Sequence, residues 1–154
     1  LKERGYAGTI YQTHGVAVMD FIRIGGKDVE GTILPTGPVV VASQLDDSNP
    51  IKKVAMAYIT AYEKAHGPGS VAAFGAHAYD AALMLQAAVP QALKAGAPGT
   101  EAFRAALRDA LEHLHEVVLT QGIVDMAPDN HNGLDQRARM MVEIKNGTWH
   151  KLPD

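Results

Sequence analysis

The sequence predicts an α/β fold with a mostly parallel sheet, flanking helices and a C-terminal antiparallel hairpin. Strand-like and helical segments alternate in the first part of the chain, which is typical of a parallel sheet covered by helices. Near the end, apolar side chains alternate along 140–145, and Asn146-Gly147, the preferred two-residue hairpin turn, joins this segment to 148–152. A length of 154 residues fits about one domain.

Composition excludes several classes of function. The net charge of -3 provides no basic surface for nucleic acid. The absence of cysteine excludes disulfides, thiolate metal sites and cysteine nucleophiles. His77 and Asp80 interrupt the apolar stretch 71–86, which favours a buried helix over a membrane span. The chain begins at Leu1, and Lys2–Tyr6 resembles the last turn of a helix, so we expect residues upstream.

The first 42 residues are expected to contain strands and one short helix. Ala7–Thr13 has the composition of a strand, and Val16–Ile24 that of a helix that ends at a glycine pair. Residues 32–42 should be extended. Pro35 and Pro38 should divide this segment in two, because proline cannot donate a hydrogen bond to a sheet.

Three helices are expected in the middle of the chain. The first helix starts at Ser48-Asn49-Pro50 and ends at Gly67-Pro68-Gly69. The second runs from a cap at Ser70 to about Ala95, with a kink at Pro90. The third starts at Pro98-Gly99-Thr100 and ends at Gly122. The second is apolar on nearly every face, and the third carries one apolar stripe. Such surfaces need a cover that this chain does not supply.

The histidines and acidic residues do not form a recognisable metal site. His113 and His115 have i, i+2 spacing, which points their rings apart on a helix. The loop 129–135 fails as a calcium loop because Pro128 occupies the first ligand position, and a turn of the Asx type is expected instead. Gly67-Pro68-Gly69-Ser70 has neither the lysine nor the spacing of a phosphate-binding loop.

His14 is the strongest candidate for a ligand-binding residue. It follows a predicted strand and precedes Gly15, at the position where open α/β sheets hold ligands. Its ring could donate to a carboxylate, and the peptide N–H groups after Gly15 would face an anion. Phe74 could form an aromatic wall of the site or belong to the core. His77 and Asp80 are i, i+3 on one helix and are expected to satisfy each other, since no serine or cysteine nucleophile accompanies them.

Five short motifs, in their order and spacing, carry a family resemblance. They are Ile10–Gly15, Glu30–Leu34, Tyr62–Gly67, Phe74 with Ala78–Ala81, and Asn146–Trp149. Together they resemble the C-terminal half of a periplasmic solute-binding protein of the leucine/isoleucine/valine-binding type, the extracytoplasmic receptor of an ABC importer. The resemblance covers essentially the whole chain.

The resemblance implies the C-terminal part of a two-lobed type I periplasmic-binding-protein fold. Residues 1–67 and 122–154 would belong to the C-terminal lobe, and 68–121 would pack on the N-terminal lobe, the rest of which is missing. Such proteins are not enzymes, carry no cofactor and close on a small molecule by hinge motion. The implied partners are a carboxylate-bearing small-molecule ligand, the N-terminal half of the same protein and an inner-membrane ABC permease, with no nucleic acid. The implied location is the periplasm.

The resemblance also implies a set of ligand-binding residues. The position of His14 is a carboxylate in amino-acid-binding members, where it holds the ammonium group of the ligand, and the position of Phe74 contacts the ligand side chain. Histidine in place of that carboxylate shifts the expectation to a small organic acid, either an aromatic carboxylate or an amino-acid-like compound. The expected site residues are Thr13, His14, Gly15, Phe74, Gly75 and His77. The alternative is a receptor's ligand-sensing regulatory domain with the same fold.

Overall fold

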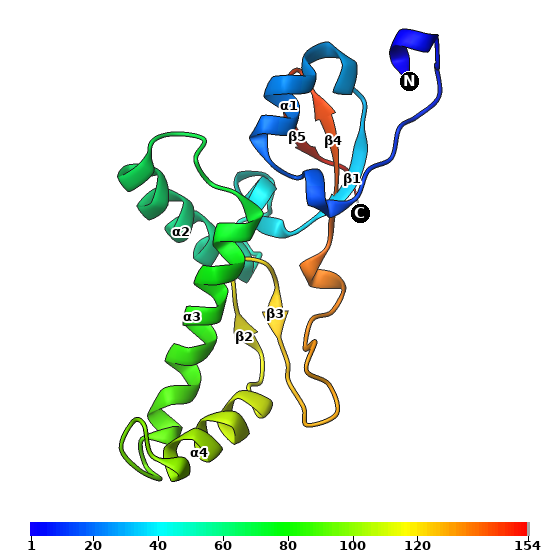
Figure 1. The fold of residues 1–154 in the computed structure, drawn as a ribbon. Helices are drawn as coiled ribbons and strands as arrows, with labels where there is room; N and C mark the ends of the chain where they lie inside the picture. The colour runs from blue at the N-terminus through cyan, green and yellow to red at the C-terminus, as the bar shows by residue number, and fades with distance from the viewer. Residues whose placement is uncertain (154) are drawn as a thin grey trace.

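The computed structural model describes residues 1–153 as an elongated molecule with a small sheet at one end and a pair of helices at the other (Figure 1). The helices are α1 (Met19–Gly25), α2 (Pro50–His66), α3 (Ala73–Ala92) and α4 (Glu101–Glu112). The strands are β1 (Ile33–Thr36), β2 (Val117–Val118), β3 (Ile123–Val124), β4 (Met140–Lys145) and β5 (Thr148–Lys151). The α/β class predicted from the sequence is confirmed.

The C-terminal hairpin forms as predicted. Strands β4 and β5 pair antiparallel up to Lys145 and Thr148, which leaves a two-residue turn. Asn146 and Gly147 have φ angles of 53° and 72°, the left-handed conformation that this tight turn requires. The Glu30 carboxylate accepts hydrogen bonds from both turn N–H groups, at 2.9 and 2.6 Å, and so ties the turn to the preceding layer.

The strands of the main sheet, in the order β1-β4-β5, pair antiparallel. The predicted strand Ala7–Thr13 contributes only one parallel bridge, between Tyr11 and Ile33, so the expected parallel part is short. The reason is local. A parallel ladder would continue with a donor at position 35, and Pro35 has no N–H. Proline is tolerated within β1 because β1 lies at the edge of the three-stranded sheet.

The second extended piece predicted from the sequence is wrong. Residues Pro38–Gln44 form 3₁₀ turns, although Val39, Val41 and Ala42 are buried as their apolar character requires. Pro38 occupies the first position of this segment, where its fixed φ favours a helical turn. The local proline geometry thus overrides the strand preference of the valines.

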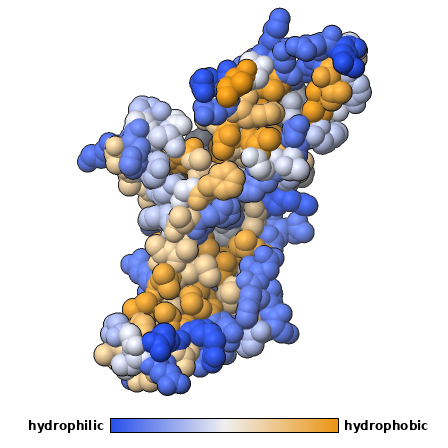
Figure 2. Space-filling model, in the orientation of Figure 1, coloured by the Kyte–Doolittle hydropathy of each residue, from blue (hydrophilic) through white to orange (hydrophobic). Residues whose placement is uncertain are grey.

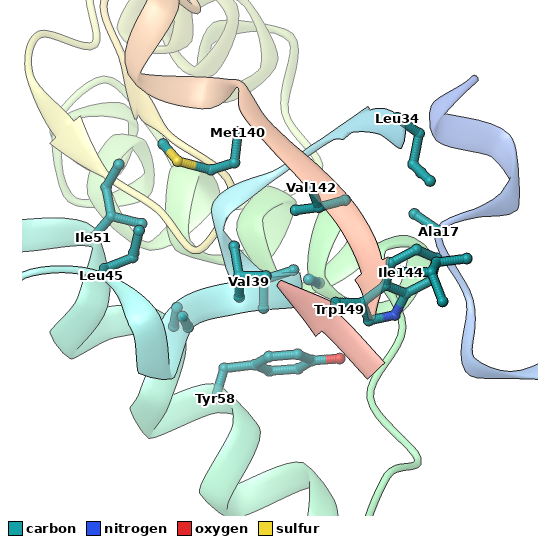
Figure 3. Packing of buried hydrophobic residues seen from close by; sticks show 14 of the residues in the cluster. Ala17, Leu34, Val39, Leu45, Ile51, Tyr58, Met140, Val142, Ile144 and Trp149 are labelled. Carbon is teal, nitrogen blue, oxygen red and sulfur yellow. The ribbon is translucent and has the colours of Figure 1, made fainter. Parts of the chain in front are cut away.

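The main hydrophobic core joins the sheet to α2 (Figure 3). Side chains from β1, the 38–44 segment, α2, β4 and β5 meet there, including Leu34, Val39, Ile51, Tyr58, Val142, Ile144 and Trp149. Leu34, Val142 and Ile144 have no exposed surface. Burial of each such side chain contributes about 1.5–3 kcal/mol relative to an exposed one. This core fixes the platform on which the site is built.

The predicted helix starts are largely confirmed. The Asn49 side chain accepts from the Ile51 N–H at 3.0 Å at the start of α2, and Thr100 caps α4 by accepting from the Phe103 N–H at 3.2 Å. Ser70 does not cap α3, because its hydroxyl donates instead to the preceding Gly67 carbonyl at 2.7 Å.

The third helix is shorter than predicted. It ends at Glu112, and residues that were expected to continue it form the β2–β3 hairpin. The β-branched pairs Val117-Val118 and Ile123-Val124 face each other across this hairpin, where their stiff side chains fit a strand better than a helix. Residues 119–122 therefore lie in a turn rather than on a helix.

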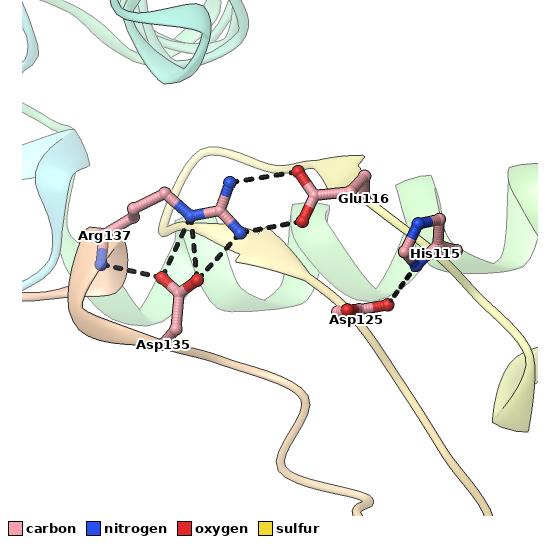
Figure 4. A network of polar contacts seen from close by, with 5 residues as sticks. All are labelled: His115, Glu116, Asp125, Asp135 and Arg137. Atoms are coloured by element: carbon pink, nitrogen blue, oxygen red, sulfur yellow. Dashed lines mark hydrogen bonds and ion pairs between the residues drawn. The ribbon is translucent and has the colours of Figure 1, made fainter.

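A second hydrophobic cluster packs α3, α4 and this hairpin together. Its buried members are Ala88, Leu114, Leu119 and Val124, and Leu134 packs against it. Arg137 links the segment before β4 to the start of β2. Its guanidinium pairs with Glu116, just before β2, at 2.9 Å and with Asp135 at 2.8 Å (Figure 4). The Arg137 guanidinium lowers the pKa of both exposed carboxyl groups.

Helix α3 is not buried on all sides. One side packs on α4 and the hairpin, but Phe74 and Leu85 on the helix and Leu93 just after its end are 62 %, 43 % and 50 % exposed. Figure 2 shows apolar surface over the end of the molecule that α3 and α4 form. The prediction of an apolar surface left uncovered by this chain is confirmed. In the described part of the chain, no helix combines the length and apolar character needed to cross a membrane.

Candidate functional site

Two of the predicted site residues, His14 and His77, come together although they are far apart in the sequence. His14 begins the 3₁₀ helix His14–Val16, next to β1, and His77 lies near the start of α3. Their ring centroids are 6.0 Å apart with the planes at 70°, an edge-to-face arrangement. The site therefore lies where the sheet end of the molecule meets α3.

The environment of His14 keeps its ring neutral. The ring is partly buried, and Nε2 has no hydrogen-bond partner. Burial, and to a smaller extent the neighbouring His77, lower the pKa of His14 below its ordinary value of 6.5. At neutral pH, one ring nitrogen of His14 can donate a hydrogen bond and the other can accept one.

The backbone around His14 does not form the predicted anion cradle. Val16 N–H donates to the Thr13 carbonyl at 3.3 Å, and Ala17 N–H donates to the His14 carbonyl at 3.0 Å. The expectation that the N–H groups after Gly15 face an anion is therefore wrong for these two groups. Thr13 and Gly15 flank the ring, and their contact with a ligand stays a prediction.

Phe74 and Gly75 lie on the first turn of α3, close to His77. The 62 % exposure of Phe74 rules out the alternative that it belongs to a core within this chain. A Cβ at Gly75 would lie 2.8 Å from the Tyr58 hydroxyl. Glycine at this position thus allows Tyr58 to approach the helix, and a ligand contact at Gly75 stays a prediction.

Asp80 does not satisfy His77, contrary to the sequence-based expectation. Its carboxylate accepts hydrogen bonds from the backbone N–H groups of Thr120, at 2.8 Å, and Gln121, at 3.0 Å. Burial raises the pKa of Asp80, while these hydrogen bonds act in the opposite direction. The expectation failed because the β2–β3 turn, which supplies the donors, was assigned to a helix.

Gln121 is a site residue that sequence reasoning missed. Its side-chain nitrogen donates to the Ala73 carbonyl at 3.2 Å and lies 3.3 Å from His77 Nε2. Its side-chain oxygen lies against Gly37, where a Cβ would be only 1.9 Å away. The β-branched pairs on either side of residues 119–122 were the available signal for this turn.

Five buried side-chain polar atoms in the described residues have no hydrogen-bond partner, and several contacts connect them to the His14–His77 region. They are His14 Nε2, Thr36 Oγ1, Tyr58 Oη, Thr120 Oγ1 and Gln121 Oε1. Gln121 contacts His77 and Gly37, the residue after Thr36, and Tyr58 contacts Gly75. Buried polar atoms are normally hydrogen-bonded, so this group is an exception that packing within the described residues leaves unsatisfied.

Comparison with solved structures shows close similarity over nearly the whole chain. An extracellular ligand-binding receptor from Rhodopseudomonas palustris is 44 % identical over 99 % of this chain, with a TM-score of 0.94. A putative branched-chain amino acid ABC transporter protein from Rhodospirillum rubrum is 30 % identical over 99 %, with a TM-score of 0.68. A leucine-binding protein from Thermotoga maritima is 25 % identical over 99 %, with a TM-score of 0.73. No protein-family profile matches the chain, and no curated protein matches it.

The chain has the type I periplasmic binding protein fold of these proteins and resembles them in sequence. It spans 43 %, 39 % and 38 % of the length of these three proteins. The family resemblance predicted from the five sequence motifs is confirmed, as is the fold class. The similar proteins are ligand-binding receptors and solute-binding proteins rather than enzymes.

His113 and His115 make local contacts. His113 lies 2.6 Å from the Asp109 carbonyl, and His115 lies 2.5 Å from Asp125 (Figure 4). Across residues 1–153, no three histidine, aspartate or glutamate side chains gather as a metal site would need. The loop 129–135 turns tightly, with the Asn130 side chain accepting from the Gly133 N–H at 3.2 Å, and the Asx-type bond lies at its end, where the Asp135 side chain accepts from the Arg137 N–H at 2.8 Å.

A cavity of about 770 Å³ lies away from the predicted site. It lies between the start of α2 and the returning segment, and its lining includes Asn49, Arg137, Arg139 and Met141. None of the six predicted site residues lines it. The His14–His77 junction is the better candidate, because predicted site residues meet there and buried polar atoms in that region lack hydrogen-bond partners.

Proposed function

We propose that this chain provides one wall of the ligand site in the substrate-binding component of an ABC importer. The ligand would be a small organic acid, either an aromatic carboxylate or an amino-acid-like compound, held between two lobes in the periplasm. The protein binds and delivers this compound without catalysis. The observation that carries the proposal is the His14–His77 pair, in which His14 Nε2 is buried and unpartnered, with the exposed ring of Phe74 three residues before His77 on α3.

The charge and chemistry of His14 favour an acidic ligand group. A neutral imidazole can donate its N–H to a carboxylate, and it takes up a proton readily when an anion approaches. An ammonium group would instead require a carboxylate from the protein, and Asp80 is already bonded to two backbone N–H groups. These features support an organic acid over a ligand recognised mainly through its ammonium group.

The exposed ring of Phe74 favours an aromatic or apolar ligand body. Aromatic rings stack at centroid separations of about 4.5–7 Å, with a gain of about 0.5–1.5 kcal/mol beyond the area that they bury. Ligand pockets typically combine such an apolar wall with a few polar groups. Phe74 and His14 are the proposed apolar and polar contacts.

The second wall of the site is proposed to come from the part of the receptor beyond this chain. This chain spans 43 % of the Rhodopseudomonas receptor, and α3 exposes apolar side chains that a second lobe would bury. In this arrangement, residues 1–67 and 122–154 belong to the C-terminal lobe, and 68–121 pack on the N-terminal lobe. An inner-membrane permease would receive the closed, liganded form.

Ligand binding by the full-length receptor tests the proposal. Isothermal titration calorimetry would compare benzoate, phenylacetate and phenylpropionate with leucine, valine and acetate. We expect at least one aromatic acid to bind more tightly than acetate and the branched-chain amino acids. Tight binding of leucine or valine with no binding of the aromatic acids would contradict an aromatic-acid ligand, and no binding of any acid would contradict the proposal as a whole.

A further inference from the structure

The side-chain amide of Gln121 joins three parts of the molecule at the ligand-binding junction. Its nitrogen lies within hydrogen-bonding distance of the Ala73 carbonyl and of His77 Nε2, both on α3 or at its start. Its oxygen rests against the backbone of Gly37, just after β1. The backbone N–H of Gln121 is held by Asp80 at 3.0 Å. Gln121 is thus held through both its backbone and its side chain.

The orientation of the amide determines the protonation of His77. The Ala73 carbonyl can only accept a hydrogen bond, so the amide group that faces it must be the NH₂. The same nitrogen faces His77 Nε2 at 3.3 Å. Because an amide nitrogen does not accept hydrogen bonds, His77 Nε2 must be the acceptor. His77 is then neutral, with its proton on Nδ1.

We propose that Gln121 is a positioning residue of the ligand site, which holds His77 in the neutral Nδ1–H tautomer and leaves His14 to take up the proton when an anionic ligand binds. The inference rests on the proposed function for the nature of the ligand. Protonation of His77 at Nε2 would place an N–H against the Gln121 NH₂, whereas His14 Nε2 is unpartnered and meets no such donor.

The other ionisable groups at the junction are Asp80 and Tyr58, and both already interact with other parts of the chain. Asp80 interacts with His77 through charge, but its two oxygens are bonded to the β2–β3 turn. Tyr58, on α2, contacts the Gly75 position and interacts with Asp80, and burial raises its pKa. A positive charge on His77 would lower the pKa of His14. Keeping His77 neutral therefore removes the repulsion that would oppose protonation of His14.

Gly37 offers a steric test of the amide's role. Its φ and ψ of -77° and 157° suit alanine, so the substitution causes no backbone strain. The added Cβ would nevertheless lie 1.9 Å from Gln121 Oε1, which forces the amide to move. Gly37→Ala should therefore release His77 without changing any group that faces it.

Nuclear magnetic resonance of the unliganded, full-length receptor, labelled with ¹⁵N at histidine, tests the positioning role without a ligand. We expect His77 in the Nδ1–H tautomer, and a mixture of tautomers in Gly37→Ala and in Gln121→Leu, which removes the amide. Gln86→Leu changes an exposed glutamine of α3 in the same way and should leave the His77 tautomer unchanged. An Nε2–H tautomer in the unsubstituted receptor, or an unchanged His77 tautomer in both Gly37→Ala and Gln121→Leu, would overturn the proposal.

Calorimetry in two buffers with different ionisation enthalpies tests the coupling to binding. With benzoate as the probe at pH 7, or the aromatic acid that binds most tightly, we expect net proton uptake that is lost in His14→Gln. Binding with no proton uptake would refute this inference and leave the proposed function standing. Failure of every acid to bind would refute the proposed function, while the tautomer result would still decide the role of Gln121.

Discussion

Replacement of His14 by alanine is expected to weaken ligand binding. The substitution removes a ring whose Nε2 is buried and unpartnered, so a ligand carboxylate would lose a charge-assisted hydrogen bond. Hydrogen bonds to charged groups contribute about 1.5–3 kcal/mol. With some replacement by water in the partly buried site, the expected loss is about 1–3 kcal/mol, or about 5- to 150-fold in Kd. Calorimetry of the full-length receptor with its tightest-binding aromatic acid would measure the loss.

The pH dependence of binding provides a second readout of the same substitution. Because the pKa of His14 is lowered in the free protein, its charged form is scarce near neutral pH, and an anionic ligand favours that form. Affinity should rise as pH falls from about 8 toward the lowered pKa, and this dependence should be absent in His14→Ala. His115→Ala, which removes an exposed histidine, is the matched control. Equal affinities for the His14→Ala receptor and the unsubstituted one would refute the reasoning.

Three further predictions concern the aromatic wall, the β2–β3 turn and the exposed helix. Phe74→Ala should weaken benzoate binding by about 1–2 kcal/mol and acetate binding much less; equal losses measured by calorimetry would show that Phe74 does not contact the ligand ring. Asp80→Ala leaves two turn N–H groups without their acceptor and should lower the free energy of unfolding by about 2–4 kcal/mol. Urea denaturation would measure this, with the exposed Asp109→Ala as control, and equal stabilities would contradict it. The isolated 154-residue chain should self-associate and bind an apolar dye, and Leu85→Glu should reduce both effects. Sedimentation that finds a compact, dye-silent monomer would contradict the proposed cover for α3.

Local chemistry made several elements predictable. Asn146-Gly147 specifies its hairpin because both residues adopt positive φ, and Asn49 and Thr100 specify helix starts because their side chains accept from nearby N–H groups. The prolines were harder to interpret. Pro35 was expected to interrupt the strand, yet it lies within β1 and instead prevents the parallel pairing with residues 10–12 from continuing.

The candidate site was only partly predictable. His14 was recognised by its position before Gly15 and Phe74 by its family motif, but neither the sequence nor the motif places a ring at a given distance from another. Gln121 carried no signal of its own, because its importance comes from Gly37, Ala73 and His77, which are distant in the chain.

The sequence alone determined the α/β class, the family resemblance, the C-terminal hairpin and the apolar character of α3. These properties depend on residues that are close in the chain, through turn conformation, helix capping and the period of apolar side chains. Only the tertiary structure decided that His14 and His77 lie 6.0 Å apart and that Asp80 holds the β2–β3 turn. Such contacts depend on how separate elements pack around a shared core, and local preferences do not specify that packing.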